Sequence, residues 1–203
     1  MERILCIGDS NTYGYDPRGW GGGRYPNDVR WTGLLRSAGL RTVNLGQNGL
    51  CIPREEAFPA LAELLRSLQP FDAVTVMLGG NDLLQGANAA QAAARMEALL
   101  RFLCRQTESA RIILICPPPV QPGTWVPDGE MMEETARLGP LYRALAGRLG
   151  VRFADAGDWG VELSFDGVHF TEAGHAAFAR ALRALLEAEE ERPKKLGKDG
   201  ERA

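Results

Sequence analysis

Ser10 is the first residue of the sequence that could do covalent chemistry. It follows a short apolar run, residues 4–7, that is typical of a fully buried strand, and it closes the motif Gly8-Asp9-Ser10. Open α/β sheets bind their ligands in the crevice at the carboxyl ends of the strands. Ser10 is therefore a candidate nucleophile, although the same residues could form a strand-to-helix turn in which Asp9 satisfies backbone groups.

A nucleophilic serine needs a general base, and the sequence contains two histidines. His169 lies between the last predicted strand and the last predicted helix, and Asp166 precedes it by three residues, close enough to orient the imidazole. The spacing permits a Ser10-His169-Asp166 triad; the structural alternative is a turn at Asp166 and a helix entry at His169. His175 falls inside the last predicted helix, where we expect it to pack or to face solvent.

An attacking serine also needs hydrogen-bond donors for the oxyanion that forms. Asn81 follows the third predicted strand and could aim its amide into the crevice, and the N–H group of Ser10 would be a second donor. The loop after the second strand, residues 44–49, offers glycines whose N–H groups can approach a substrate closely. Each of these residues could equally serve a turn. The hypothesis rests on their common place at one edge of the sheet.

Short apolar runs alternate with helix-period segments, the pattern of βαβ units around a parallel sheet. We predict a three-layer α/β/α fold with a flavodoxin-like, five-stranded parallel sheet. Asn88 is placed to cap the third long helix, and Pro140 should kink or split the fourth near Leu138. The predicted strands span residues 4–7, 42–44, 73–78, 112–116 and 151–153, and the predicted helices cover 28–38, 61–68, 89–103, 131–149 and the segment from 171 onward.

The composition bounds the class of protein. A chain of 203 residues with 45% hydrophobic and 24% charged residues is sufficient for one globular domain. We expect this domain to cover residues 1–189, followed by a solvated tail at 190–203 that lacks apolar periodicity. The net charge of -3, with scattered Lys and Arg, argues against a nucleic-acid partner. Since no leader or membrane-spanning run is apparent, we expect a cytoplasmic protein that does not bind membranes.

The four cysteines show no C-x-x-C pairing, which argues against a zinc site or a redox motif. Cys6 and Cys116 fall in predicted strands and are expected in the core. Two long loops, residues 14–27 and 117–129, follow strands at the carboxyl edge, where loops often carry function. They supply the candidate pocket residues Tyr15, Trp20 and Trp125, to which we add Asn11 and Tyr13 beside the serine.

Four motifs occur in a fixed order: Gly8-Asp9-Ser10, a glycine loop after the second strand, Gly79-x-Asn81-Asp82, and Asp166-x-x-His169. Together they resemble the blocks of the SGNH (GDSL) hydrolases over nearly the whole chain. Longer strings strengthen a likeness to the arylesterase and acyltransferase branch of that family: Trp31-Thr32-Gly33, residues 77–82, residues 117–119 and residues 166–171.

The resemblance implies that Ser10 is the nucleophile, His169 the general base and then acid, and Asp166 the orienting carboxylate. It also implies an oxyanion hole made by the N–H groups of Ser10 and Gly49 and by the Asn81 side chain. Gly49 matches the family's backbone donor better than Gly46, which we interpret as a turn residue. One departure is Asn11, which replaces an apolar residue after the serine and is expected to alter the lip of the pocket. No metal or organic cofactor is required.

The expected activity is that of a serine esterase that hydrolyses small-molecule, short-chain acyl (acetyl-type) esters through an acyl-serine intermediate. The aromatic residues of the edge loops could narrow the pocket in favour of short chains. Carbohydrate O-deacetylation and acyl transfer are compatible with the same residues, and the family likeness is compatible with a homo-oligomer. A non-enzymatic alternative is a flavodoxin-like module that binds phosphate or flavin. A P-loop nucleotide hydrolase is excluded because its glycine-lysine motif does not occur.

Overall fold

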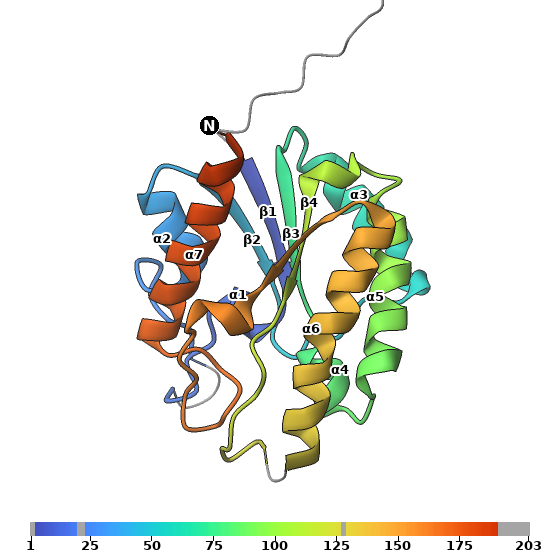
Figure 1. The fold of residues 1–203 in the computed structure, drawn as a ribbon. Coiled ribbons are helices and arrows are strands. Elements are labelled where there is room, and N and C mark those ends of the chain that lie inside the picture. Colours follow the sequence, from blue (N-terminus) through green and yellow to red (C-terminus); the bar gives the residue numbers. More distant parts are fainter. Residues whose placement is uncertain (1–2, 20–22, 127–128, 191–203) are drawn as a thin grey trace, which may run out of the picture.

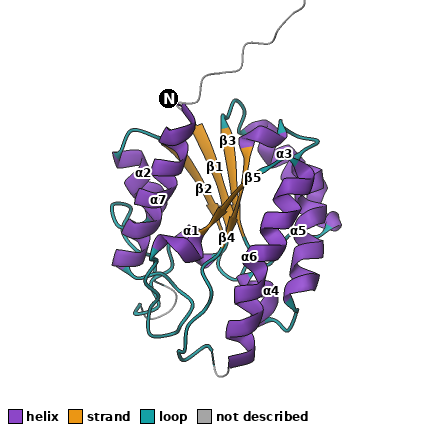
Figure 2. Ribbon diagram, viewed as in Figure 1, coloured by secondary structure: helices purple, strands orange, loops and turns teal. Residues whose placement is uncertain are grey.

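The protein is a three-layer α/β/α structure built on one parallel sheet, seen in a computed structural model that describes residues 3–19, 23–126 and 129–190. The five strands are ordered β2-β1-β3-β4-β5, so the strand order reverses between β1 and β3. Figure 2 shows the strands as a single layer between two groups of helices. The predicted fold class and number of strands are confirmed. The strands are β1 (Arg3–Gly8), β2 (Arg41–Gly46), β3 (Ala73–Met77), β4 (Ile112–Cys116) and β5 (Arg152–Asp155).

The helices divide between the two faces of the sheet because side chains alternate along each strand. Leu5 and Ile7 of β1 pack with α3, α5 and α6, whereas Ile4 and Cys6 pack with α2 and α7 (Figure 1). Each face therefore has its own hydrophobic core. The α-helices are α1 (Ser10–Tyr13), α2 (Trp31–Ser37), α3 (Phe58–Ser67), α4 (Gly80–Leu84), α5 (Ala89–Leu103), α6 (Gly129–Leu149) and α7 (Glu172–Glu190), with 3-10 turns η1 (Glu55–Ala57), η2 (Ser109–Arg111) and η3 (Ala156–Trp159).

Two helix predictions can be compared directly with the structure. Asn88 caps α5 as expected: its side chain accepts the Gln91 N–H, and the Gln91 side chain accepts the Asn88 N–H in return. Pro140 does not split its helix, because α6 continues from Gly129 to Leu149. Leu138 and Tyr142, on either side of the proline, are fully buried, so packing on both sides holds the helix together despite the missing N–H donor.

The ends of the chain differ in how far they can be compared with prediction. Helix α7 continues through Glu190, so the first residue of the predicted tail is helical, and residues 191–203 lie outside the described part. Among the described helices, none has the length and apolarity needed to cross a membrane. Cys6 and Cys116 are buried in strands as expected, and all four cysteines are free.

Candidate active site

The chain turns sharply after β1 and places Ser10 at the carboxyl edge of the sheet. Asp9 is the N-cap of α1, and its carboxylate accepts the Asn11 N–H at 3.0 Å. Gly14 ends the helix with φ of 88°, a left-handed conformation that favours glycine. Helix α1 is thus a single turn, and Ser10 is 6% exposed on it. The predicted turn-stabilising role of Asp9 agrees with this geometry.

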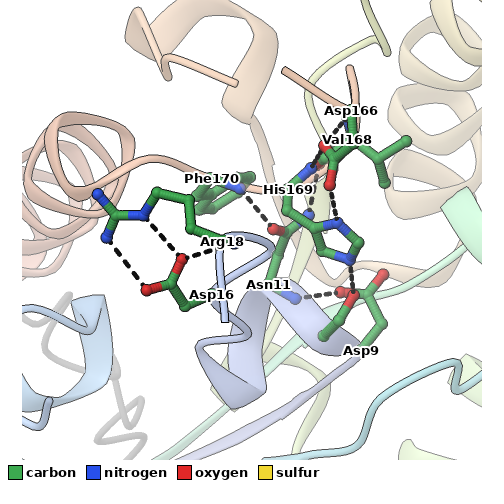
Figure 3. A network of polar contacts seen from close by, with 9 residues as sticks. Asp9, Asn11, Asp16, Arg18, Asp166, Val168, His169 and Phe170 are labelled. Carbon is green, nitrogen blue, oxygen red and sulfur yellow. Dashed lines mark hydrogen bonds and ion pairs between the residues drawn. The ribbon is translucent and has the colours of Figure 1, made fainter. Parts of the chain in front are cut away.

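Ser10, His169 and Asp166 lie in one hydrogen-bonded line. The Ser10 Oγ is 3.0 Å from His169 Nε2, and His169 Nδ1 is 2.6 Å from Asp166 Oδ2. Figure 3 shows the His169 ring directed at the Asp166 carboxylate through one nitrogen. Both residues are almost completely buried, so water competes little for these bonds. In this order, an imidazole can take up a serine proton while the carboxylate fixes its tautomer.

The pKa values of Asp166 and Asp9, two of the buried carboxylates near Ser10, are shifted in opposite directions. Burial acts to raise the pKa of Asp166, but the hydrogen bonds from the His169 ring and from the His169 and Val168 N–H groups lower the net pKa below its usual value. Asp166 therefore stays ionised and can hold the Nδ1 proton of His169. Burial raises the pKa of Asp9 to about 6, although the Asn11 N–H acts in the opposite direction.

The loop after β4 supports the segment that carries Asp166 and His169. The Trp125 N–H donates to the Asp166 carbonyl at 3.1 Å. A Cβ on Gly123 would lie 2.3 Å from the Asp166 carbonyl carbon, so only glycine allows the two backbones to approach this closely. On the other side, the Ser164 N–H donates to the His169 carbonyl at 2.7 Å. The loop after β4 therefore holds in place the segment that carries Asp166 and His169.

Asn81 lies at the start of α4, on the loop side of β3. Its side-chain amide donates to the Leu50 carbonyl at 3.1 Å, which uses one of its two N–H bonds and orients the other. Asp82 reinforces this link, since its carboxylate accepts the Ile52 N–H at 2.9 Å and pairs with Arg95 at 2.7 Å. The loop after β2 and the first turn of α4 are therefore joined as one unit.

The two glycines of the loop after β2 differ in what surrounds them. The Gly46 N–H donates to the Asn44 side chain at 2.9 Å, and a Cβ at Gly46 would lie 2.2 Å from the Tyr13 nitrogen. Gly49 has φ of 73° and open space where a Cβ would be, and its N–H has no acceptor among the described residues. Gly46 is thus committed to packing against α1, whereas Gly49 has a donor available for a ligand.

The predicted pocket residues are brought together only in part. Tyr15 and Trp125 flank His169, with ring centroids 4.5 Å and 5.0 Å from the imidazole, and Trp125 is 51% exposed. Tyr13 lies instead under the Arg24 guanidinium, 4.0 Å from ring centroid to cation. Trp20 lies outside the described residues.

The sequence analysis expected Asn11 to alter the lip of the pocket; in the structure its side chain is held by backbone groups. It is 7% exposed, and its side chain is hydrogen-bonded to the backbone of Val168 and Phe170 (Figure 3). An amide can make both bonds because it is donor and acceptor at once, which the apolar residue expected here could not do. The side chain is therefore directed at the segment around His169.

Two supporting features were missed by the sequence analysis. The sequence analysis assigned no role to Asp82 or to Arg95. The available signal was Arg95 itself, an arginine directly after the alanine-rich start of α5, where an acidic partner would explain a charge. Of possible metal sites, the described residues contain no group of three or more His, Cys, Asp or Glu suited to hold an ion.

Several similar solved structures are described as esterases. The chain is 28% identical to the aryl esterase of M. smegmatis, with a TM-score of 0.78 over 93% of this chain and 99% of that one. A carbohydrate acetylesterase family member from Sinorhizobium meliloti is also 28% identical, with a TM-score of 0.80 over 93% and 98%. A protein from Agrobacterium tumefaciens str. C58, provisionally described as an arylesterase, is 31% identical, with a TM-score of 0.80 over 93% and 99%.

The fold, the motifs and these neighbours define a carboxylic ester hydrolase. Residues 6–177 match the model of the GDSL-like lipase/acylhydrolase family, and the chain belongs to that family. The resemblance to the SGNH (GDSL) hydrolases is confirmed, and the flavodoxin-like binding module is disfavoured. A sequence search of curated proteins found no match.

Proposed function

We propose that the protein hydrolyses short-chain acyl esters, with Ser10 as nucleophile, His169 as general base and acid, and Asp166 as the carboxylate that orients the imidazole. The observation that carries the proposal is the line from Ser10 Oγ through the His169 ring to Asp166 Oδ2, with separations of 3.0 and 2.6 Å. The lowered pKa of Asp166 supports it further, because an ionised carboxylate stabilises the imidazolium formed during the reaction.

In the first half of the reaction, His169 Nε2 accepts the Ser10 proton while Ser10 Oγ bonds to the acyl carbon. The π electrons of the carbonyl group move to its oxygen, which becomes the oxyanion of a tetrahedral intermediate. When this intermediate collapses, the bond to the alcohol oxygen breaks and the alcohol takes the proton from His169. Water then attacks the acyl-serine by the same steps, with His169 again as base, and releases the acid and the free Ser10 hydroxyl.

The oxyanion would be bound by the N–H groups of Ser10 and Gly49 and by the free N–H of the Asn81 amide. Support comes from the Asn81–Leu50 hydrogen bond of 3.1 Å, which joins the Gly49 loop to α4 and orients the amide before substrate arrives. Donors fixed in advance cost no reorganisation when the charge develops.

The substrate is proposed to carry a short acyl group, since Tyr15 and Trp125 both lie against His169 and restrict the room beside it. A nitrophenyl ester series from acetate to long-chain acids tests this point. We expect kcat/KM to be highest for acetate or propionate and to fall with chain length; a preference for long chains would contradict the proposal.

Carbohydrate O-deacetylation is a second candidate, because one of the similar solved structures is described as a carbohydrate acetylesterase family member. An acetylated oligosaccharide, compared with phenyl acetate at equal concentration, separates the two classes of leaving alcohol. Adding a primary alcohol to the same assay measures acyl transfer, which would appear as a new ester in place of the free acid.

The nucleophile is tested by Ser10→Ala, with Ser37→Ala as a matched control at an exposed serine of α2. We expect Ser10→Ala to lose p-nitrophenyl acetate turnover by orders of magnitude, since alanine has no hydroxyl to form the acyl-enzyme. Ser37→Ala should retain wild-type kcat. Near-native turnover in a folded Ser10→Ala protein would rule out the mechanism.

A further inference from the structure

Asn11 connects the turn that carries Ser10 to the segment that carries His169. Its side-chain amide donates to the Val168 carbonyl at 3.1 Å, and its Oδ1 accepts the Phe170 N–H at 2.9 Å. The two partners are the residues immediately before and after His169. Figure 3 shows the Asn11 side chain lying alongside this segment. One amide thus spans the backbone on both sides of the candidate base.

The backbone of Asn11 is anchored separately from its side chain. Its N–H donates to the Asp9 carboxylate at 3.0 Å, and its carbonyl accepts the indole N–H of Trp31 at 3.0 Å. The first bond caps α1 and the second joins α1 to α2, and both use backbone atoms that are present whatever side chain stands at position 11. Among the described residues, the Asn11 side chain is hydrogen-bonded only to the segment around His169, so loss of these bonds affects the position of that segment relative to Ser10.

We propose that Asn11 is a positioning residue, which sets the distance and orientation of His169 relative to its neighbour Ser10 through this two-point amide bridge. The inference rests on the proposed roles of Ser10 and His169. Asparagine suits the task because a short side chain must present a donor and an acceptor together. Aspartate retains only acceptors at neutral pH, and leucine has neither group.

The bridge influences the distance between Ser10 and His169, on which catalysis depends. Proton transfer needs the Ser10 Oγ and His169 Nε2 within hydrogen-bond reach, and they are 3.0 Å apart. A misplacement of about 1 Å can lower a rate by roughly 100-fold. Loss of the bridge should therefore reduce kcat while substrate contacts, and with them KM, change little.

The test compares Asn11→Leu and Asn11→Asp with the matched control Asn88→Leu. The control removes the cap of α5 and should lower the melting temperature, but it contacts none of Ser10, His169 and Asp166. We expect kcat for p-nitrophenyl acetate to fall roughly 10- to 100-fold in both Asn11 variants, with KM nearly unchanged. Labelling by a fluorophosphonate should slow by a similar factor. Asn88→Leu should keep wild-type kcat.

The inference is overturned if a folded Asn11 variant has wild-type kcat, or if Asn88→Leu loses as much activity at an equal loss of melting temperature. If neither Asn11 variant folds, NMR of the wild-type protein decides: side-chain amide protons of Asn11 protected from exchange support the bridge, and exchange at the solvent rate overturns it. Wild-type turnover in Ser10→Ala would instead remove the proposed function, whatever the Asn11 variants show.

Discussion

His169 Nε2 lies 3.0 Å from the Ser10 Oγ, although the two residues are 159 positions apart in the sequence. The contact exists because β1 and the segment after β5 both end at the same edge of the parallel sheet. Proton transfer from Ser10 therefore depends on the orientation of the His169 ring, which is hydrogen-bonded to the Asp166 carboxylate. The first prediction concerns this carboxylate.

Asp166→Asn is predicted to lower kcat by roughly 10³- to 10⁴-fold, as expected when the histidine is held in the wrong tautomer. The asparagine amide would donate to His169 Nδ1, which places the ring proton on Nε2 facing Ser10 and leaves no base. Steady-state kinetics on p-nitrophenyl acetate measure the change. Asp28→Asn, at an exposed loop position, is the matched control. A fall of less than 10-fold would show that Asp166 does not orient the base.

Asn81→Ala is predicted to lower kcat by roughly 10²- to 10³-fold, the usual effect of removing one oxyanion donor, with a small change in KM. Asn88→Ala loses a helix cap instead, and it should cost about 1 kcal/mol in the free energy of unfolding while leaving kcat unaltered. Equal kinetic losses in the two variants would mean that the Asn81 effect reflects destabilisation and not catalysis.

The two glycines after β2 are predicted to respond oppositely to alanine. Gly49→Ala meets open space and should cost about 1 kcal/mol for its left-handed φ of 73°, with kcat kept because the N–H remains. Gly46→Ala should cost more and lower kcat, since its Cβ would lie 2.2 Å from the Tyr13 nitrogen and displace α1. Urea unfolding and kinetics test the order, and a greater loss of stability in Gly49→Ala would contradict it.

His175→Phe is predicted to make the protein more resistant to acid. The ring of His175 packs against Tyr25 and Phe170, and its nitrogens have no hydrogen-bond partner among the described residues. Burial, aided by Arg30, lowers its pKa from 6.5 to about 4. Because the folded-state pKa is depressed, the stability due to neutral His175 is present above the unfolded pKa and is lost as the pH falls toward the folded pKa.

The size of this effect follows from the pKa difference, which corresponds to about 3 kcal/mol. Unfolding by urea at a series of pH values should show the advantage of His175→Phe over wild type growing by that amount between pH 6.5 and 4. Asp9 also titrates in this range but is present in both proteins, so it cancels in the difference. Parallel pH curves would show that His175 is not buried in its neutral form.

Much of the fold could be predicted from the sequence, because the strands are marked by short apolar runs and the long helices by apolar residues at helical spacing. All five strands were predicted, and the motif order indicated which loops meet at the carboxyl edge. The short helices α1 and α4 were not predicted, since single turns leave no periodic pattern. Pro140 does not split α6, because tertiary packing outweighed a local preference.

The supporting contacts of the site were harder to predict than its candidate residues. Ser10, His169 and Asp166 are marked by residue type and place, whereas the Asn11 bridge depends on how two distant backbones align. The same holds for Asp82 and Arg95, whose pairing joins α4 to α5. A sequence shows that such polar groups exist but does not show which backbone atoms they will meet.

The central claim is that Ser10 is the nucleophile, and covalent labelling tests it most directly. The wild-type protein is treated with a fluorophosphonate, digested, and mapped by mass spectrometry. We predict a single phosphonylated peptide modified at Ser10, complete loss of turnover on labelling, and no labelling of Ser10→Ala. The account would be contradicted if turnover were abolished while the label lay on another residue and Ser10 remained unmodified.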